Sequence, residues 1–566
     1  MEEEMRYLEL FLQTFFISII LFCASNSFSQ TKIGSGQISG NFMFDGMFYM
    51  PDSVIGAAET DDKVRANTYL NLLYTNGGFS AGLRYEFYLY PLVDFEKIGY
   101  KGQGITNFFG EYKNDYIEVT AGTFYEQFGN GFALRAYEER TLGIDNSLLG
   151  VKIHAKPYNG IHLKGVWGIE RKNFDFDYLS RRDFVRGLDA EINFGEMISA
   201  MGEKGFTAAI GGSFVSKYEK ADDPVLKLPA NVALWAARLQ FGFKGFRIEA
   251  EYAGKINDPN YTNGYIYKNG VAFLATASYS MKGLGVSASF VRTDNMDFRS
   301  QRDIISSTNL LSINNIPVIT KTYSYKLLGD YGYSTQPNGQ IGVQAQVNYK
   351  IPKKTKIGGK YGTDISIAYS RMHDIERKWG EPSDSTGSYK GTDGYKSGFF
   401  KFGKNLLYQD IGIEISRKFT QRWRLELAYN YITYNLELLQ GHTGEPVVHA
   451  HNVAADLLCN INTKHALRLE LQHLYTKQDC GSSLYAMLEY SIAPHWFFSV
   501  GDEWNYGNPE KGHRTHFFNV AASYVIKTTR ISLNYGKTKD GMLCIGGVCR
   551  EVPAAYGVGL SVTTSF

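Results

Sequence analysis

The sequence predicts an all-β fold, a single-chain antiparallel transmembrane β-barrel of about 24 strands, within a range of roughly 22 to 26. Three observations lead to this prediction. The composition favours strands and turns, with 15% aromatic residues, 40 Tyr and 59 Gly but only 14 Pro among 566 residues. Short segments alternate apolar and polar side chains, and the connections between them alternate between short and long. After the N-terminal region no apolar run reaches the length of a membrane-spanning helix, which excludes a helical membrane protein.

An apolar stretch near the N-terminus predicts a cleaved signal peptide. Residues 11–24 are mainly apolar and are followed by a small-x-small pattern ending at Ser29, with Gln30 as the expected first mature residue. We therefore expect a signal peptide over residues 1–29 and a single transmembrane β-barrel domain over residues 30–566. The few residues between Gln30 and the first strand leave no room for an N-terminal plug domain. Cleavage moves the net charge from +2 to about +5, a mild excess that predicts no nucleic-acid partner.

The alternation is clearest in the last strand. Val558, Leu560 and Val562 share one face, while Gly, Ser and Thr residues share the other. The chain ends on Phe566, which resembles the terminal aromatic signal read by the barrel-insertion machinery, and we expect it to be an assembly signal. The barrel is expected to close between this strand and a first strand that begins near Gln37.

Charged side chains identify the face that lines the lumen. An Arg or Lys facing lipid near the midplane would cost about 2–4 kcal/mol, so the charged face must point inward. Several strands repeat Arg-x-Glu with the Arg nearer the short turn, which predicts a basic belt near the periplasmic mouth and an acidic belt above it. Two interpretations remain. In the first, the charges form rows of ion pairs that keep the water-facing wall rigid. In the second, some charges stay unpaired and bias ion passage. The belt residues are Arg84, Glu86, Arg247, Glu249, Arg424, Glu426, Arg468 and Glu470.

The short turns set the expected orientation, because every one of them falls on the same side when strands are counted. Short turns and the C-terminus are expected to be periplasmic and the long loops extracellular, which predicts an outer-membrane location. The turns are Gly77-Gly78, Asn114-Asp115, Asn159-Gly160, Lys244-Gly245, Lys282-Gly283, Thr420-Gln421, Thr463-Lys464 and Thr528-Thr529.

The longest outer loops are expected at residues 125–149, 296–338 and 375–404, and loops of this length usually carry function or fill a lumen. Residues 125–149 hold the densest mixed-charge cluster in the chain. This loop is either a constriction folded into the lumen or a solvated rim loop. We favour the inward interpretation, because residues such as Phe132 and Leu142 would otherwise be exposed. The candidate constriction residues are Arg135, Glu138, Glu139, Arg140 and Asp145.

Two cysteines near the C-terminus are expected to form a disulfide. Cys544 and Cys549 flank a Gly-Gly hairpin tip that places them on opposed positions, and the periplasm is oxidising.

Other motifs favour structural roles. The hydrolase-type pattern around Ser80 opens an alternating strand instead of a strand-turn-helix, so a lumen-facing serine is expected there. His449 and His451 share one strand face without a nearby ligand cluster, which indicates solvated histidines at a barrel rim. No phosphate-binding loop or dinucleotide fingerprint is present. We expect no catalytic residues, no cofactor and no metal site.

Three stretches resemble an uncharacterised family of outer-membrane barrels from Bacteroidota, known only as a domain of unknown function. They are residues 124–146, which begin FYEQFGNG; residues 315–339, which end YGYSTQPNG; and residues 549–554, CREVPA. The resemblance extends over most of the mature chain. It implies a barrel fold but no established activity and no catalytic residues.

Two functions from different classes are expected from these patterns. The first is a channel or transport barrel for an unidentified solute, with residues 125–149 and 296–338 filling the lumen. The second is a non-conducting structural or secretion-associated scaffold. Neither is an enzyme. The expected partners are outer-membrane lipid, lipopolysaccharide and the barrel-insertion machinery, and further protein partners are left open.

Overall fold

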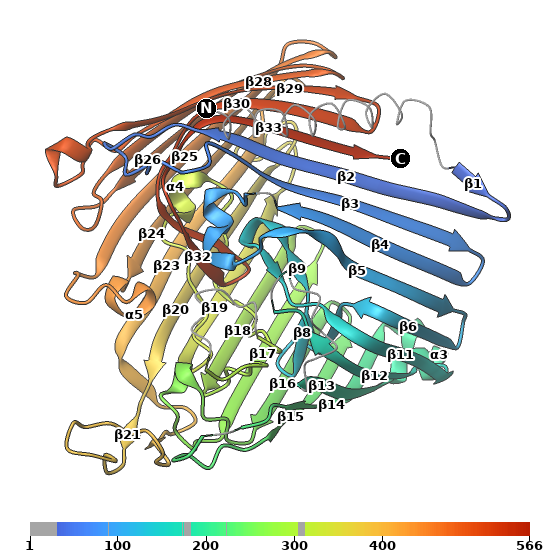
Figure 1. Ribbon diagram of the computed structural model, residues 1–566. Helices are drawn as coiled ribbons and strands as arrows, with labels where there is room; N and C mark the ends of the chain where they lie inside the picture. Colours follow the sequence, from blue (N-terminus) through green and yellow to red (C-terminus); the bar gives the residue numbers. More distant parts are fainter. Residues whose placement is uncertain (1–30, 89, 173, 175–182, 222, 304–311) are drawn as a thin grey trace.

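The computed structural model describes residues 31–88, 90–172, 174, 183–221, 223–303 and 312–566, and these form a closed antiparallel β-barrel (Figure 1). Within this part of the chain the main sheet has 25 strands. Because β1 (Thr31–Ile33) pairs only with β2, 24 strands close the ring. The predicted fold class is confirmed, including the strand number. The signal peptide predicted for residues 1–29 lies outside the described residues.

Each barrel strand pairs with the next one along the chain, and the last pairs with the first. The barrel strands are β2 (Gly36–Tyr49), β3 (Val64–Asn76), β4 (Phe79–Tyr88), β5 (Gly102–Lys113), β6 (Ile117–Phe124), β11 (Leu148–Tyr158), β12 (Ile161–Glu170), β13 (Phe184–Asn193), β14 (Phe206–Tyr218), β15 (Asn231–Phe243), β16 (Phe246–Lys255), β17 (Gly270–Met281), β18 (Leu284–Asp294), β19 (Gly339–Ile351), β20 (Thr363–Ile375), β23 (Phe402–Lys418), β24 (Trp423–Tyr434), β25 (Val448–Asn460), β26 (His465–Tyr475), β27 (Ser483–Ile492), β28 (Trp496–Trp504), β29 (His516–Ile526), β30 (Thr529–Thr538) and β33 (Ala555–Ser565).

The two ends of the barrel differ in the length of their connections. Tight turns lie at one end, on the right of Figure 1, and the expected short turns fall there to within one residue. Two connections at this end are longer: residues 194–205, which hold α2 (Phe194–Met197) and α3 (Ser199–Glu203), and residues 352–362. The remaining connections lie at the opposite, long-loop end.

Apart from β1, the other short elements of the described residues lie in the connections at the long-loop end. These are β7 (Glu126–Phe128), β8 (Leu134–Ala136), β9 (Glu138–Glu139), β10 (Ile144–Asp145), β21 (Lys378–Trp379), β22 (Tyr395–Lys396), β31 (Gly541–Ile545), β32 (Val548–Val552), α4 (Lys326–Gly329), α5 (Leu436–Gln440) and the 3-10 helices η1 (Val93–Ile98), η2 (Arg140–Leu142), η3 (Tyr261–Asn263) and η5 (Lys511–His513).

The two faces of the wall differ in polarity as the alternation predicts. On the outer face of neighbouring strands β28, β29 and β30, the side chains of Val500, Val520 and Leu533 are 50%, 48% and 52% exposed. On the inner face at the β2–β33 seam, the Ser561 hydroxyl donates to the Asp45 carboxylate over 2.5 Å. A closed barrel with an apolar outside and a polar inside is the β architecture that spans an outer membrane. None of the described helices is long and apolar enough to cross a membrane.

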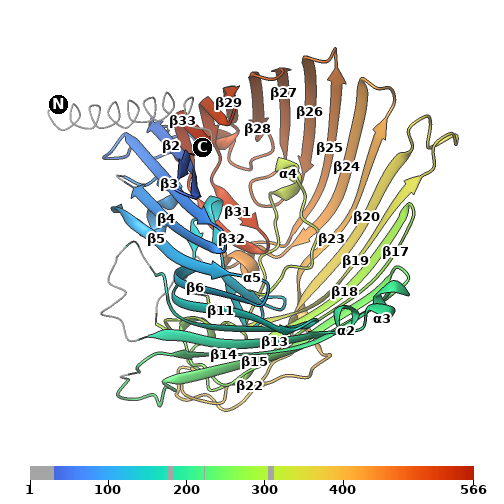
Figure 2. The ribbon, with the colours of Figure 1, turned by 90° about the vertical axis from the view of Figure 1, so that its right-hand side faces the viewer.

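One connection covers the outside of the wall. Residues 376–401, between β20 and β23, include β21 and β22, and we call them the outer strap; Figure 2 shows β22 outside the ring. Tyr395 of the strap packs with Ile341 and Ile375 of the wall, and its hydroxyl donates to Asp294 over 2.7 Å. The strap therefore shields polar wall positions of β18 from the surroundings of the barrel.

Deleting Phe566 is expected to impair assembly, because this residue holds the end of the barrel seam. Its backbone N–H donates to the Gly40 carbonyl over 2.9 Å, and its carbonyl accepts from the Gly40 N–H over 2.8 Å. The fraction of heat-modifiable barrel in outer membranes measures assembly by gel electrophoresis. Phe566→Tyr, which keeps both the aromatic ring and the backbone bonds, is the control. Normal levels of heat-modifiable barrel after the deletion would contradict the prediction.

Candidate functional site

Three connections from the long-loop end fold back into the barrel and form a plug in its lumen. Plug loop 1 is residues 125–147, plug loop 2 is residues 295–338 and plug loop 3 is residues 539–554. Figure 2 shows β31, β32 and α4, which belong to plug loops 3 and 2, inside the ring of strands. Residues 304–311 of plug loop 2 lie outside the described part of the chain.

Plug loop 1 is anchored by an apolar core. Phe128, Phe132 and Leu134 are buried in one cluster with Met296 and Phe298 of plug loop 2. Each large apolar side chain buried in this way contributes about 1.5–3 kcal/mol, so this contact fixes both loops against the wall. The wall residues of the cluster come from β6 and from β11 to β17: Phe124, Leu148, Val166, Val185, Val215, Val232, Leu234, Ala236, Ala253 and Ala272.

Plug loop 2 continues across the lumen to the opposite wall. In α4, the Leu327 backbone N–H donates to Gln472 of β26 over 2.8 Å. The Lys326 ammonium pairs with Glu503 of β28 at 2.7 Å. Apolar contacts accompany these polar ones, since Leu327 and the tyrosines at 331 and 333 pack among wall side chains. Those wall side chains are Val291, Met372, Leu407, Tyr408, Ile432, Tyr434, Val448, Ala450 and Leu474.

Plug loop 3 joins the other two loops. The Thr335 backbone N–H of plug loop 2 donates to the Gly547 carbonyl over 2.9 Å. Val548 packs against Leu142 of plug loop 1, and the Arg550 guanidinium donates to the Thr141 carbonyl over 2.9 Å. The hairpin of β31 and β32 therefore lies against both of the other plug loops.

The structure contains a disulfide between Cys544 and Cys549 at the tip of this hairpin. Replacing both residues by Ser is expected to leave the melting temperature of the barrel nearly unchanged, because a bond with a sequence separation of 5 closes only a short loop. The effect should be a local increase in amide hydrogen exchange over residues 541–552. Mass spectrometry of non-reduced protein checks the bond itself, and finding both thiols free would overturn this prediction.

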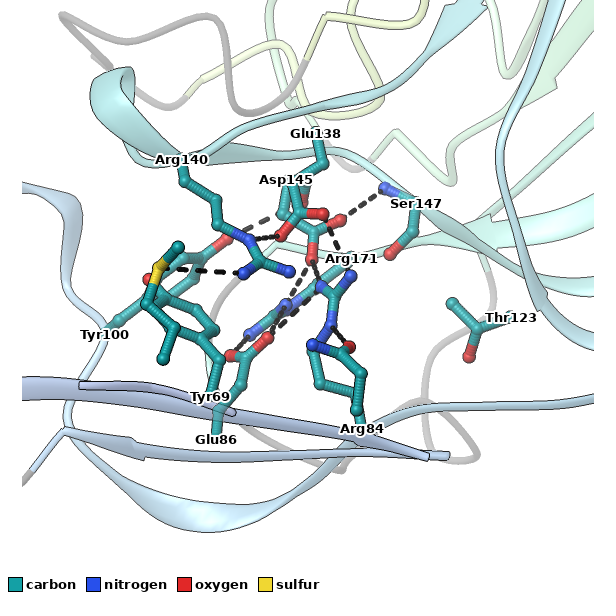
Figure 3. A network of polar contacts seen from close by, with 12 residues as sticks. Tyr69, Arg84, Glu86, Tyr100, Thr123, Glu138, Arg140, Asp145, Ser147 and Arg171 are labelled. Carbon is teal, nitrogen blue, oxygen red and sulfur yellow. Dashed lines mark hydrogen bonds and ion pairs between the residues drawn. The ribbon is translucent and has the colours of Figure 1, made fainter. Parts of the chain in front are cut away.

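A buried network of charges connects plug loop 1 to the wall (Figure 3). Arg84 of β4 pairs with Glu138 at 2.9 Å and with Asp145 at 3.3 Å. Arg171, which follows β12, pairs with the same Asp145 at 2.5 Å and with Glu86 of β4 at 2.8 Å. Asp145 therefore lies between two guanidiniums that belong to different parts of the barrel.

The charges in this network are removed from water. Arg171 is 1% exposed, Glu86 1% and Asp145 4%. Burial by itself would raise the pKa of Asp145, but the Arg171 and Arg84 guanidiniums outweigh burial and hold this pKa below its usual value. The carboxylate therefore stays ionised, and the network remains a set of charge pairs.

A second buried charged cluster fixes plug loop 2 at its start. The Lys217 ammonium of β14 pairs with Asp258 at 2.9 Å and donates to the Arg299 carbonyl over 2.6 Å. Lys255 of β16 donates to the Asp297 carbonyl. Two wall lysines thus hold the backbone of plug loop 2 at residues 297 and 299.

A third charged group lies around α4. Burial raises the pKa of Asp330 to about 6, with Lys539 of plug loop 3 opposing the effect and Glu503 adding to it. Ionisable groups from plug loops 2 and 3 and from the wall thus lie close together around α4.

The other constriction candidates lie in plug loop 1 with different contacts. The Arg140 guanidinium lies over the ring of Tyr69 at 4.5 Å, beside the charge network. Arg135 lies over the ring of Tyr137 at 4.3 Å, and the Glu139 carboxylate accepts from a backbone N–H at the start of η2. The structure therefore brings Glu138, Arg140 and Asp145 together, whereas Arg135 and Glu139 make local contacts within the loop.

The other predicted belt residues form ion pairs within their own strands. Arg247 pairs with Glu249 and Arg424 with Glu426, and both arginine side chains are more than half exposed. Arg468 pairs with the glutamate two positions along at 2.6 Å and also reaches Asp456 at 2.7 Å. Arg84 and Glu86 differ from these pairs because plug loop 1 covers them.

A cavity of about 550 Å³ lies between Tyr325 of plug loop 2 and the walls of β18 to β20 and β23 to β26. Its lining carries charges of both signs, including Lys350, Asp364, Glu414, Glu426, Asp456 and Arg468. Glu426 of β24 and Arg468 of β26, two of the predicted belt residues, therefore border water-accessible space beside plug loop 2.

The remaining motifs of the sequence lie on barrel strands. Ser80 sits in β4 opposite Glu111 of β5. His449 and His451 lie on β25 and contact the Tyr431 and Tyr429 hydroxyls at 3.0 Å each. In the described residues, no group of three or more His, Cys, Asp or Glu is arranged to hold a metal ion.

Sequence reasoning missed Arg171, the two wall lysines and the plugging role of residues 541–552. Arg171 carries no periodic signal, because it lies just beyond the end of β12. The hairpin could have been found by the criterion used for plug loop 1: Met542, Leu543, Ile545 and Val548 are too apolar for a solvated loop tip.

Comparisons with known proteins give a family but no activity. A model described as a family of unknown function, DUF6029, matches residues 10–566. No curated protein matches the chain. Among solved structures, the siderophore receptor PirA from Pseudomonas aeruginosa is 11% identical, with 95% of this chain and 81% of that chain covered and a TM-score of 0.40. The P pilus usher PapC translocation pore is 10% identical, with 94% and 99% covered and a TM-score of 0.37. The outer membrane protein OpdK from Pseudomonas aeruginosa is 9% identical, with 72% and 97% covered and a TM-score of 0.31.

Proposed function

Since the chain belongs to the family of unknown function DUF6029, we propose a function from the barrel itself: an outer-membrane transport barrel for an unidentified solute, gated by the three plug loops. The long loops are extracellular and the short turns periplasmic in this proposal, and the plug closes the lumen from the outside. The protein is not an enzyme.

One observation carries this proposal: the barrel's own loops form a plug, and a water-accessible, charged cavity lies between this plug and the wall. A 24-stranded barrel is too wide for its wall side chains to fill, so the state of its interior depends on the loops. The cavity lined by Tyr325 carries charged side chains of both signs. Within the described residues, the contacts between the plug loops and the wall are hydrogen bonds, ion pairs and apolar packing, without a covalent cross-link. A solute or a partner could therefore displace the plug without breaking a covalent bond.

The second candidate is a non-conducting scaffold, and the dense packing of the plug favours it. The apolar clusters at Phe128 and Leu327 and the buried pairs at Asp145 each oppose opening. A barrel sealed permanently in this way could serve as a structural or secretion-associated outer-membrane component.

Reconstitution into planar lipid bilayers separates the two candidates. A transport barrel should give discrete current steps when voltage or solute displaces the plug. A scaffold should give no steps at any voltage. A complete absence of steps in wild-type protein and in protein without its plug would overturn the transport proposal.

The exposed wall arginines are expected to affect ion selectivity. Replacing Arg247 and Arg424 with Gln leaves Glu249 and Glu426 without their ion-pair partners in the lumen. We expect the ratio of K⁺ to Cl⁻ permeability to rise about twofold, because the wall becomes more negative. Reversal potentials in a salt gradient measure this ratio, with a Lys390→Gln variant in the outer strap as the control. An unchanged permeability ratio would show that these ion pairs serve only to stiffen the wall.

A further inference from the structure

The outer face of the wall carries a row of histidines and tyrosines near the long-loop end. They occupy β20, β23 to β26, β28 and β29. Ladder pairing connects part of the row, because Thr433 pairs with His449, Tyr431 with His451, and His451 with Tyr475. Across β27, which contributes no member, Nε2 of His473 lies 2.8 Å from the Tyr506 hydroxyl. We call the row the His–Tyr belt. Its members are Arg371, His373, Gln409, Tyr429, Tyr431, Thr433, His449, His451, His473, Tyr475, Trp504, Tyr506 and His516.

The belt faces away from the lumen. Ile411 and Val453, which alternate in phase with it along β23 and β25, are each 48% exposed and belong to the apolar outer surface. The intervening positions Ala450 and Asn452 are 0% exposed and face the filled lumen. The belt is therefore a polar stripe between the apolar outer wall and the long loops, where a lipid headgroup would lie.

Contacts within the belt leave polar groups available to a ligand. The Tyr431 hydroxyl lies 3.0 Å from Nδ1 of His449, and the Tyr429 hydroxyl lies 3.0 Å from Nδ1 of His451. A hydroxyl that donates to Nδ1 fixes the proton of a neutral imidazole on Nε2, where it can be donated outward. His449 and His451 are both exposed.

The belt also carries positive charge. The Arg371 guanidinium donates to Gln409 over 2.6 Å and to Nε2 of His373 over 3.0 Å, so it lies in the surface of the belt. One carboxylate on this face, Asp502, is paired with His516 at 2.6 Å. A permanent cation beside several imidazoles suits a ligand that carries phosphate.

We infer that the His–Tyr belt binds the phosphate groups of a phosphorylated glycolipid in the outer leaflet of the membrane. The inference rests on the orientation in the proposed function, in which the long-loop end faces outward. The acyl chains would lie along the apolar outer wall below the belt, and the tyrosine and tryptophan rings would lie at the headgroup level.

The opposite end of the barrel provides a matched control. Its outer face also carries histidine–tyrosine contacts, between His465 and Tyr490 at 2.6 Å and between the rings of His495 and Tyr524 at 5.7 Å. These two histidines lie at the short-turn end, whereas Arg371 lies near the long-loop end of β20. They test whether histidines at a membrane interface are sufficient to bind phosphate, or whether phosphate binding requires the His–Tyr belt with its arginine.

The test measures binding of lipid A to the purified, detergent-solubilised protein by native mass spectrometry. The probes are lipid A with both phosphates and the same lipid A without phosphate. The belt variant combines Arg371→Gln, His449→Phe and His451→Phe, which keeps aromatic rings at the interface. The control variant combines His465→Phe and His495→Phe. Heat modifiability establishes that each variant is assembled, and His449→Phe alone replaces the belt variant if the triple change fails to assemble.

We expect wild-type and control protein to bind phosphorylated lipid A at least about tenfold more tightly than the dephosphorylated form. The belt variant should lose this preference. Equal binding of the two probes, retention of the preference by the belt variant, or its loss in the control variant would each overturn the inference. Because the belt lies outside the wall, its variants should keep the conductance of the wild type, so a failure here is distinguishable from a failure of the transport proposal.

Discussion

Replacing residues 317–335 with a short Gly-Ser linker is expected to raise the single-channel conductance at least about tenfold. This segment carries α4 and the side chains that pack against the wall of β18 to β26. Without it, the lumen would be bordered by the wall that this segment now covers and by the remaining plug loops. Conductance steps in planar bilayers provide the measurement.

The control for this change is a replacement of the same kind in the outer strap, over residues 384–393. The strap lies outside the ring of strands, so its loss should leave the conductance unchanged. If the plug-loop variant assembles but conducts no better than wild type, plug loop 2 does not close the lumen. Equal effects of the two replacements would indicate a general loosening of the barrel.

Asp145→Ala is expected to destabilise the attachment of plug loop 1 by about 3–5 kcal/mol, because it leaves two buried guanidiniums without their shared carboxylate. Arg171 is 1% exposed and Arg84 is 7% exposed, so water replaces little of the lost interaction. Amide hydrogen exchange over residues 125–147 reports this free energy as a loss of protection. The barrel strands should keep their protection from exchange.

Glu426→Ala is the matched control for this variant. It removes a carboxylate from the Arg424 pair, in which the arginine side chain is 52% exposed. An exposed pair of this kind contributes about 0–1 kcal/mol, so protection should change little. Equal effects of Asp145→Ala and Glu426→Ala would contradict a special role for the buried network.

The strands of the barrel could be predicted from the sequence because lipid imposes a rule on every second residue. Val558, Leu560 and Val562 had to face one side, and Arg247 and Arg424 the other. The short turns follow from the same rule, since glycine or polar pairs interrupt the alternation where strands reverse. Strand number and closure then follow from counting.

The plug could be predicted only in part, because loops have no period. The apolar residues of plug loop 1 indicated that it folds inward, and Phe132 and Leu142 are indeed buried. The partners of its charges could not be derived. Arg171 meets Asp145 only because β12 ends beside plug loop 1, and Arg84 pairs with Asp145 because plug loop 1 reaches down to it. These contacts depend on the path of the chain through space.

The position of plug loop 3 has a consequence for the order in which the parts of the barrel can fold. Its hairpin lies against both other plug loops, yet it belongs to the last connection before β33. Its contacts join residues far apart in the chain: Arg550 reaches Asp94 over a separation of 456 residues, and Gly547 reaches Thr335 over 212. Closing a chain segment of such length costs loop entropy before these contacts can stabilise the fold. We therefore expect the plug to be sealed at the same stage of biogenesis as the seam between β33 and β2, so that a chain stalled before that stage would expose its first two plug loops.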